Sequence, residues 1–538
     1  MRAFAGLVLA LGFALLAAFP LSATAAAIDS ALVEKLALGE ADEKVEALNQ
    51  LVAKGDAAIL LLLQAMTDGD VQTAGKRVLI VKDGAATDAA TGAKVEPLPE
   101  AREDVVVNNR LRRELASAIA ALKLMVPDRN VRFEAAKELQ GNADEAMLPL
   151  IKKALASETD AAIKSMLELT AASLEIKSGD KTGRLAAIKM LGNSNNAAAK
   201  TLLLGFVEKN KDGTYVEGDV EMRTAAQASL KAVESRLAWG DRIGLLFTGV
   251  SLGSILLLAA LGLAVTYGLM GVINMAHGEL IMIGAYTTYV VQNLFRAHLP
   301  GAFDWYLLCA IPAAFMVSAA VGMLLERSVI RWLYGRPLET LLATWGISLV
   351  LIQAVRTIFG AQNVQVENPA FMSGGIELMS GVVMPYSRIV IIFFAAAVLI
   401  GMWLLLTRTR LGLFVRGVTQ NRAMASCVGV HTARVDTWAF GLGSGVAGLA
   451  GCALSQIGNV GPDLGQAYIV DSFMVVVLGG VGQLAGTVYA ALGLGFANKF
   501  LEAWSGAVLA KIAVLVFIII FIQKRPQGLF ALKGRVLD

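Results

Sequence analysis

Three side chains with hydrogen-bonding chemistry lie close together inside an otherwise apolar stretch, in the segment GVINMAHGE. They are Asn274, His277 and Glu279, and each costs free energy in lipid unless it faces protein or water. The neighbouring Gly271 and Gly278 allow a helix to break here, which would free backbone groups to face a cavity. The segment therefore predicts polar groups that shape a translocation path or its gate. A satisfied cluster that only fixes the packing of neighbouring helices is the alternative.

Residues that carry chemistry in enzymes do not form a recognisable set. The three histidines are far apart and the phosphate-binding pattern GxxxxGK[ST] is missing, so we expect no catalytic group, no metal site and no ATPase in this chain. Many glycines instead lie in apolar stretches, where small residues let helices pack closely. They comprise Gly441, Gly443, Gly445, Gly448, Gly451, Gly479, Gly480, Gly482 and Gly486. The adjacent Gly479 and Gly480 would also allow a helix to break beside a path.

Positive charge is concentrated in residues 407–435, between two apolar segments. The stretch carries Arg408, Arg410, Arg416, Arg422 and Arg434, with no acidic residue. A short loop of this kind belongs on the cytoplasmic side, because positive charge resists translocation. Apolar residues recur at roughly helical spacing, which predicts a short amphipathic helix. They are Leu411, Phe414, Val415, Val418, Ala423 and Val428. A solvated, positive-inside loop is the simpler interpretation.

The elements around these residues are predicted to be membrane helices. The chain has 538 residues, of which 56% are hydrophobic, and this excludes an ordinary soluble protein. Hydropathy indicates about eight or nine spans. The segments are 244–269, 276–295, 306–325, 338–359, 388–406, 436–456, 468–481, 484–501 and 507–523. The segment 468–481 is short, so eight full spans with a re-entrant piece is the alternative. The net charge of +3 gives no support for nucleic-acid binding.

The first part of the chain has a different character. Residues 1–27 resemble a cleaved signal peptide, with a positive Arg2, a short apolar core and a small-residue cleavage site. Residues 28–240 should then form an extracytoplasmic domain that is mostly helical. The strand-like stretches 77–81 and 93–97 predict a small β-hairpin within it. The three cysteines all lie in the membrane part, residues 241–538, so this domain holds no disulfide framework.

A loose repeat runs through this exported domain. Three segments, 132–139, 184–191 and 223–230, place an arginine, two small or apolar residues and a leucine on one helical stripe. Asp128, Asp180 and Asp219 precede them and are suited to cap helices. The pattern is like that of HEAT-type helical pairs, although the spacing is irregular. Such a surface suits a partner protein, and a stabilising lid is the alternative.

Loop charges predict the orientation of the spans. Basic residues near Arg331, in 407–435 and near Lys524 belong inside, whereas the loop 360–387 carries Glu367 and Glu377 and fits outside. An exported N-terminal domain followed by nine crossings leaves the C-terminus in the cytoplasm. The sequence therefore predicts a multi-pass protein of a bacterial inner membrane.

Five blocks of the second half resemble permeases of the branched-chain amino-acid ABC-importer family, and they occur in the order seen there. They are INMAHGE, ERSVIRWLYGRP followed by ATWGISLVL, RTRLGLFVRGVTQNR, VVVLGGVGQLAGTVYAALGLG and RPQGLF. The resemblance implies a transport subunit that is not an enzyme. It also implies a second homologous permease, two ATP-binding subunits that hold the ATP and Mg²⁺, and an extracytoplasmic substrate-binding protein. No cofactor is expected in this chain, and its surroundings are membrane lipid.

The same resemblance gives residues 407–435 a role, because in that family this loop rests on the ATPase and couples ATP hydrolysis to helix movement. Arginine suits such contacts, since its fork of donors pairs with carboxylates on a partner. We expect Arg416 and Arg422, with Gln420 and Asn421 between them, to make the contacts. The implied coupling residues are Arg410, Gly412, Arg416, Gln420, Asn421, Arg422 and Gly429.

Within the family, two features look like the urea-transporter permease. One is the long exported domain containing NNRLRRELASAIAALKLMVPD, and the other is the segment YIVDSFMVVV. Urea is small, neutral and rich in donors and acceptors, so its site should offer amide and hydroxyl groups. Asn274, Asp471 and Ser472 are candidates, although Asp471 also fits a capping or packing role. An importer of branched-chain or other amino acids is the nearer alternative, and a non-transporting receptor or scaffold the more distant one.

Overall fold

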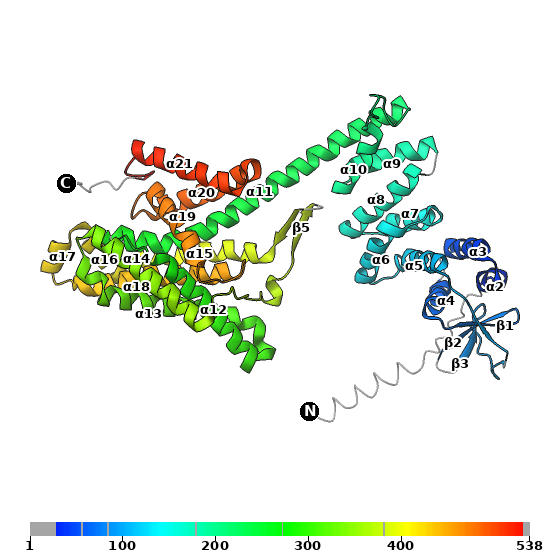
Figure 1. The fold of residues 1–538 in the computed structure, drawn as a ribbon, viewed down its shortest axis with the longest axis horizontal. Helices are drawn as coiled ribbons and strands as arrows, with labels where there is room; N and C mark the ends of the chain where they lie inside the picture. Colours follow the sequence, from blue (N-terminus) through cyan, green and yellow to red (C-terminus); the bar gives the residue numbers. More distant parts are fainter. Residues whose placement is uncertain are drawn as a thin grey trace, which may run out of the picture. The chain divides into compact units, whose positions relative to one another are not determined.

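The computed structural model describes residues 28–530, apart from 55–56, 83–84, 100, 178–179, 272 and 380–381. The predicted signal peptide 1–27 therefore lies outside the described residues. By its contacts the chain divides into two units, Met1–Leu237 and Ala238–Asp538, with the division inside one long helix, α11 (Val220–Met270). Figure 1 labels the elements of both units.

The first unit consists mainly of short helices whose apolar faces meet in two cores. The helices are α2 (Ser30–Leu38), α3 (Ala41–Lys54), α4 (Ala57–Asp68), α5 (Asn109–Lys123), α6 (Arg129–Asn142), α7 (Leu148–Ser157), α8 (Ala161–Lys177), α9 (Lys181–Asn193) and α10 (Ala197–Val207), with η1 (Glu145–Met147). One core extends from α2 to α8, and the other joins α8, α9 and α10 to the first turns of α11.

The predicted capping aspartates begin their helices. Asp128 accepts hydrogen bonds from two backbone N–H groups of α6, Asp180 does so at α9, and Asp219 accepts from Glu221 at the start of α11. The repeated arginines have matching partners as well. Arg132 forms a two-pronged ion pair with Glu158, and Arg184 pairs with Glu217. Each arginine thereby joins its helix to the loop that begins a later one.

The prediction of a small β-hairpin from residues 77–81 and 93–97 is wrong in part. The first unit holds a four-stranded sheet in the order β3-β2-β1-β4, built from β1 (Val71–Ala74), β2 (Arg77–Lys82), β3 (Ala85–Asp88) and β4 (Glu103–Asp104). The stretch 77–81 is a strand as expected, but its neighbours are β1 and β3. The stretch 93–97 contributes only an isolated bridge between Lys94 and Thr87, because β3 already occupies that edge of β2.

The second unit is helical, and every predicted span contains a helix. After α11 come α12 (His277–His298), α13 (Tyr306–Ser328), α14 (Pro337–Phe359), α15 (Tyr386–Arg408), α18 (Thr432–Ser455), α19 (Leu464–Gly479), α20 (Leu484–Ser505) and α21 (Ala507–Lys524). Among the described residues, seven helices are long and apolar enough to cross a membrane. The polar α12 and the shorter α19 fall outside that group, so the count of full spans is lower than the sequence predicted.

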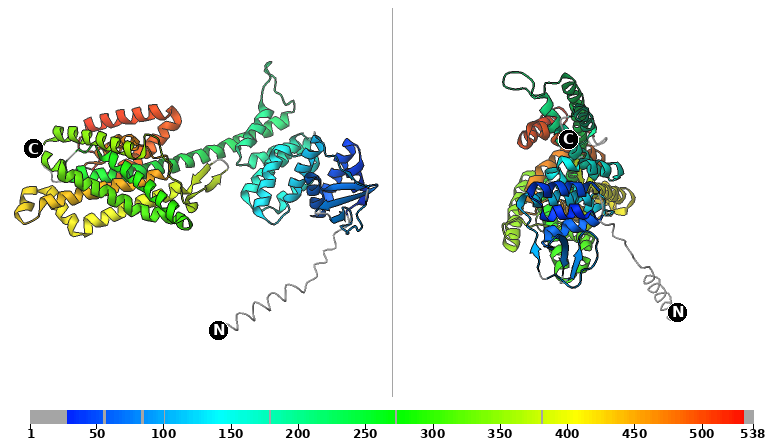
Figure 2. Two further views of the ribbon diagram at one scale, coloured as in Figure 1. Left: turned by 60° about the horizontal axis from the view of Figure 1, so that its bottom comes forward. Right: turned by 90° about the vertical axis from the view of Figure 1, so that its right-hand side faces the viewer.

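Small residues allow three of these helices to pack very closely. The helices α12, α13 and α18 contact one another most extensively, and α18 is buried along most of its length. Figure 2 shows the helices of this unit from two further sides. A side-chain carbon added to Gly284 of α12 would overlap the backbone of Gly448 in α18, and one added to Gly451 would overlap Ile281. Gly479 and Gly486 meet in the same way between α19 and α20. The predicted packing role of these glycines is confirmed.

Short elements connect the spans. They are the 3-10 turns η2 (Pro300–Trp305), η3 (Ile330–Leu333) and η4 (Ala370–Met372), the strands β5 (Gly375–Met379) and β6 (Val382–Pro385), and the helices α16 (Arg410–Gln420) and α17 (Arg422–Cys427). The strands β5 and β6 pair antiparallel inside the stretch 360–387, which the sequence analysis treated as a plain loop. The helices α16 and α17 lie within the arginine-rich stretch, residues 407–435.

Candidate functional site

The helical path breaks between α11 and α12, where the sequence places its polar residues. The helix α11 ends at Met270, and Gly271 follows with a φ of 66°, a conformation that favours glycine. Asn274 then closes a turn by accepting a hydrogen bond of 3.0 Å from the backbone N–H of Ala276, just before α12 begins. Asn274, His277 and Glu279 are all buried. The break is confirmed at Gly271, whereas Gly278 lies within α12 and packs against Gly465 of α19.

His277 and Glu279 contact different helices. The His277 Nε2 lies 2.9 Å from the carbonyl oxygen of Ala259 in α11, and its ring packs against Gly262. A carbonyl only accepts, so Nε2 carries the proton and Nδ1 is left as an acceptor. Glu279 contacts α14, where the Ser348 hydroxyl donates a hydrogen bond of 2.6 Å to Oε1. His277 therefore packs between α12 and α11. Glu279 is the polar group of a second interface, between α12 and α14.

A stripe of hydroxyl groups on α14 faces this turn. Thr340, Thr344 and Ser348 are spaced four residues apart, so they share one side of the helix, and all three are buried. Thr344 accepts a hydrogen bond of 3.2 Å from the backbone N–H of Met275. We call this contact, residues 274–279 against Thr344 and Ser348, the α12–α14 seam. The Thr340 hydroxyl instead donates to the carbonyls of Leu333 and Arg336. The spacing TxxxTxxxS within an apolar span was the signal that could have identified it from sequence.

The remaining predicted path residues lie on α19. Asp471 forms an ion pair of 3.7 Å with Lys511 of α21, and the Ser472 hydroxyl donates to the carbonyl of Tyr468 in its own helix. Gly479 packs on Gly486, and Gly480 ends α19 with a φ of 99°, close to the backbone of Phe530. These contacts hold α19 to α20, α21 and the segment that follows α21. The helix break predicted at Gly479 and Gly480 is thereby confirmed.

The arginine-rich stretch folds into two short helices with an apolar side. The helix α16 buries Val415 and Val418, and α17 buries Ala425. Gly412 lies so close to the backbone of Leu406 in α15 that no larger residue would fit. Gly429 follows the end of α17 with a φ of 87°, as expected for a glycine that terminates a helix.

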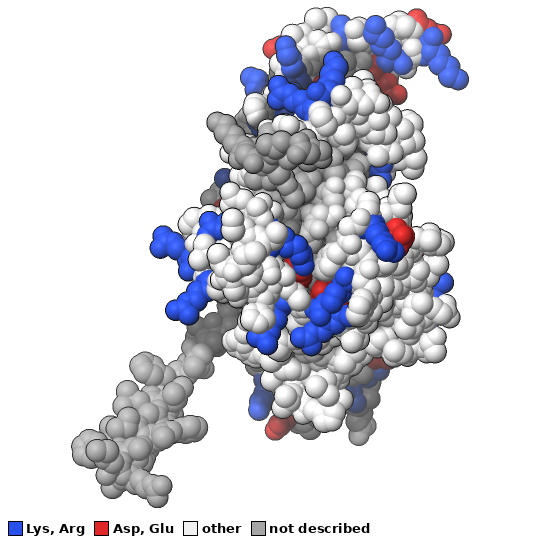
Figure 3. Space-filling model, turned by 90° about the vertical axis from the view of Figure 1, so that its left-hand side faces the viewer, with Lys and Arg blue, Asp and Glu red and all other residues white. Residues whose placement is uncertain are grey.

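Exposed polar groups cover the other side of these helices. Arg410, Arg416 and Gln420 are exposed, and Asn421 caps α17 by accepting from the N–H of Met424. Lys and Arg side chains outnumber acidic ones on the face of the molecule shown in Figure 3. The predicted amphipathic helix is confirmed in part. The stretch forms two helices that meet at Asn421, and three of the expected apolar positions, Phe414, Ala423 and Val428, are exposed.

Arg422, in contrast to Arg410 and Arg416, has a carboxylate partner among the described residues. It forms an ion pair with Asp436, whose side chain is only 3% exposed, and its guanidinium lies 5.2 Å from the centre of the Tyr334 ring. Nearby, the fully buried Glu326 pairs with Arg331 and accepts a hydrogen bond of 2.6 Å from Thr437. Glu326 raises the pKa of Arg331 above its ordinary value, because their hydrogen bond favours the charged guanidinium.

These contacts form one charged cluster, residues Glu326, Arg331, Tyr334, Arg422, Asp436 and Thr437. The cluster joins α17 to the ends of α13 and α18 and to η3. The Tyr334 hydroxyl also lies 3.4 Å from the sulfur of Met270, the last residue of α11 before the break. Sequence reasoning missed the cluster because its members are up to about a hundred residues apart and meet only in the fold.

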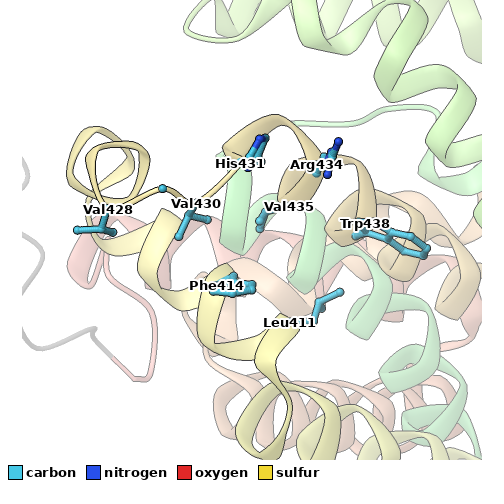
Figure 4. Close-up of a pocket in the computed structure, with 9 residues that line it drawn as sticks. Leu411, Phe414, Val428, Val430, His431, Arg434, Val435 and Trp438 are labelled. Atoms are coloured by element: carbon cyan, nitrogen blue, oxygen red, sulfur yellow. The ribbon is translucent and has the colours of Figure 1, made fainter.

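An apolar groove lies beside the cluster, between α16 and the beginning of α18. It has a volume of about 560 Å³. Figure 4 shows Leu411 and Phe414 on α16 opposite Val435 and Trp438 on α18, with His431 and Arg434 at one edge. Phe414, Val428 and Trp438 are exposed although they are apolar. The short helices thus present both positive charge and apolar surface.

Comparisons with known proteins place this second unit in a family. A family model described as branched-chain amino acid transport system / permease component matches residues 245–523. The high-affinity branched-chain amino acid transport system permease protein BraD of Pseudomonas aeruginosa is 29% identical over 290 residues, which cover 53% of this chain and 94% of BraD. LivH of Escherichia coli, with the same description, is 28% identical over 293 residues, covering 53% of this chain and 94% of LivH.

A sugar permease is also related. The ribose import permease protein RbsC of Escherichia coli is 30% identical over 206 residues, which cover 36% of this chain and 61% of RbsC. No solved structure matches at a significant level. The family model begins at residue 245, so the first unit lies outside the matched range. Because the match spans just over half of the chain, this protein belongs to the family of permease components of branched-chain amino acid transport systems, which are membrane subunits of ABC importers and not enzymes.

Proposed function

We propose that this permease carries urea or a short amide. The observation that supports the proposal is the chemistry of the α12–α14 seam. Its side chains offer hydroxyl, amide and carboxyl groups, and in the described part of the chain the hydrogen-bond partner of Glu279 is a hydroxyl rather than an Arg or Lys. A neutral molecule rich in donors and acceptors can satisfy such groups without bringing a charge of its own into a buried site.

Branched-chain amino acids are the second candidate, because BraD and LivH carry that description. An amino acid enters as a zwitterion, and its carboxylate would need a cation or several donors once it leaves water. The named residues of the seam provide one carboxyl group, which suits the ammonium group of such a substrate, and no Arg or Lys for its carboxylate. The receptor or scaffold hypothesis has less support, since family membership favours transport.

The remaining parts of the importer follow from the same proposal. A substrate-binding protein delivers the substrate at the outer face, and two ATP-binding subunits, with their ATP and Mg²⁺, press on α16 and α17 from the cytoplasm. A second, homologous permease completes the path. The first unit is extracytoplasmic in this proposal, and its helical surface suits a partner protein, with a stabilising lid as the alternative. The exposed arginines and apolar groove of α16 and α17 support this placement of the ATPase.

Uptake of labelled urea and of labelled leucine by a strain that lacks this chain tests the proposal. Restoring the chain should restore urea uptake, and Glu279→Gln should restore less of it although the protein reaches the membrane. Leucine uptake should not depend on the chain. Restoration of leucine uptake alone would establish the amino-acid alternative.

A further inference from the structure

We infer that the α12–α14 seam is a binding station for a neutral, amide-type substrate, with Ser348 and Thr344 as its specificity-determining residues. The inference rests on the proposed function, and it adds a second helix to the residues that the sequence singled out. Both hydroxyls are buried, and both contact the turn at residues 274–279 rather than only their own helix.

Polar atoms without partners indicate that this turn receives a ligand. The Oε2 of Glu279 and the Nδ2 of Asn274 have no hydrogen-bond partner among the described residues, although each residue is only 2% exposed. Buried polar atoms are nearly always paired, and water is scarce at membrane depth. Oε2 can accept an N–H and Nδ2 can donate to a carbonyl, so a molecule that carries both groups suits this turn. Urea and simple amides carry these two groups side by side.

The Ser348 hydroxyl on α14 can exchange hydrogen-bond partners during transport. In this structure Ser348 donates its one proton to Glu279. When a substrate N–H takes that place, the hydroxyl can rotate and accept a bond instead, because it has two acceptor positions. Thr344 holds the turn beside it through the backbone of Met275. The polar groups of α14 therefore keep a hydrogen-bond partner at every step.

The seam has an apolar boundary farther along α14. The buried stripe continues from Ser348 to Ile352 and Val355, which have no polar side-chain atoms. Beyond them, Phe359 packs against the ring of Tyr286 in α12, with 4.7 Å between ring centres. The station is thus confined to the first half of α14.

Substitutions on α14 test the inference in the complete importer, reconstituted with its binding protein and ATPases. Ser348→Ala should lower the rate of urea transport about tenfold, as expected when a hydrogen bond to a charged group is lost. Ser348→Thr keeps the hydroxyl and should retain most of the rate, whereas Thr344→Val should lower it. Thr357→Val is the matched control, because that hydroxyl lies on the same helix but is exposed and bonds to the carbonyl of Gln353.

A second control separates a binding role from packing. Ser318 of α13 is fully buried and donates to the carbonyl of Leu280 in α12, so Ser318→Ala removes an interhelical hydrogen bond near Glu279 without touching the seam. An equal loss of rate in Ser318→Ala and Ser348→Ala would overturn the inference, and so would an unchanged rate in Ser348→Ala. If the wild-type complex moves leucine but not urea, the proposed function fails. In that case a loss of leucine transport confined to Ser348→Ala and Thr344→Val would still place the station at the seam but would overturn its preference for amides.

Discussion

Glu279 and His277 lie two positions apart, yet their side chains have different surroundings. The His277 ring fills the space between α12 and α11, where Gly262 leaves room for it. Glu279 keeps one oxygen without a partner among the described residues, on the side of α12 that faces α14. At the scale of residues, the polar turn therefore contains both a packing group and a group available to a substrate.

These surroundings predict different outcomes for two substitutions. His277→Ala should lower the stability of the purified protein by about 2 kcal/mol or more, because it leaves a cavity and removes a donor from the Ala259 carbonyl. Glu279→Gln keeps the size of the side chain and an oxygen for Ser348, so stability should change little while transport falls. Thermal unfolding in detergent and uptake in vesicles measure the two effects. Normal stability in His277→Ala would contradict the packing role.

At the scale of elements, the charged cluster connects the arginine-rich helices to the helix ends around the break. Arg422 joins α17 to Asp436 of α18, and Tyr334 lies between Arg422 and Met270 of α11. Direct contacts therefore connect α17 to the end of α11 at Met270, four residues before Asn274. A force on α17 can be transmitted along these contacts. Arg422 thus has an internal partner, and its side chain stays about half exposed. Its expected contact with a separate ATPase, like that of Arg416, stays a prediction.

A charge exchange tests the internal link. Arg422→Glu places a second carboxylate beside the buried Asp436, which should cost about 3 kcal/mol and reduce substrate-stimulated ATP hydrolysis. The double variant Arg422→Glu/Asp436→Arg should recover much of that stimulation. Arg416→Glu serves as the control, since Asp436→Arg should not restore it. Failure of the double variant to recover would mean that Arg422 acts on a partner.

The sequence predicted those parts of the fold that depend on neighbouring residues. Apolar runs located the membrane helices, Asp128 and Asp180 marked helix starts, and Gly271 marked the break. Contacts between distant residues were not accessible in this way. Glu279 and Ser348 are 69 positions apart, and the two-residue strand β4 exists only because β1 offers it a free edge. The intrachain partner of Arg422 was missed for the same reason.

At the scale of the whole molecule, the prediction concerns topology. The signal-like start, the loop charges and the helical first unit lead us to expect that unit outside and residues 407–435 inside. A reporter that is active only outside the cytoplasm should work when fused at residue 211, between α10 and α11, and should be silent at residue 429. Thiol labelling of intact cells with an impermeant reagent gives an independent check at the exposed Cys427, in a Cys309→Ser variant because Cys309 is exposed as well. Labelling of Cys427 from outside would reverse the orientation.

The helix α19 is shorter than the candidate spans, and if it crosses the bilayer its length has a consequence for the surrounding lipid. Its 16 residues span about 24 Å, whereas the hydrocarbon core of a bilayer is about 30 Å thick. Helices that are too short draw the bilayer thinner around them, at a cost of fractions of a kcal/mol for each ångström. Acyl-chain length should therefore act as a regulator of the importer, with faster uptake in vesicles of shorter-chain phosphatidylcholine. Equal rates of uptake in thin and thick bilayers would mean that neighbouring helices shield α19 from lipid. Membrane thickness would then not limit the activity of this permease.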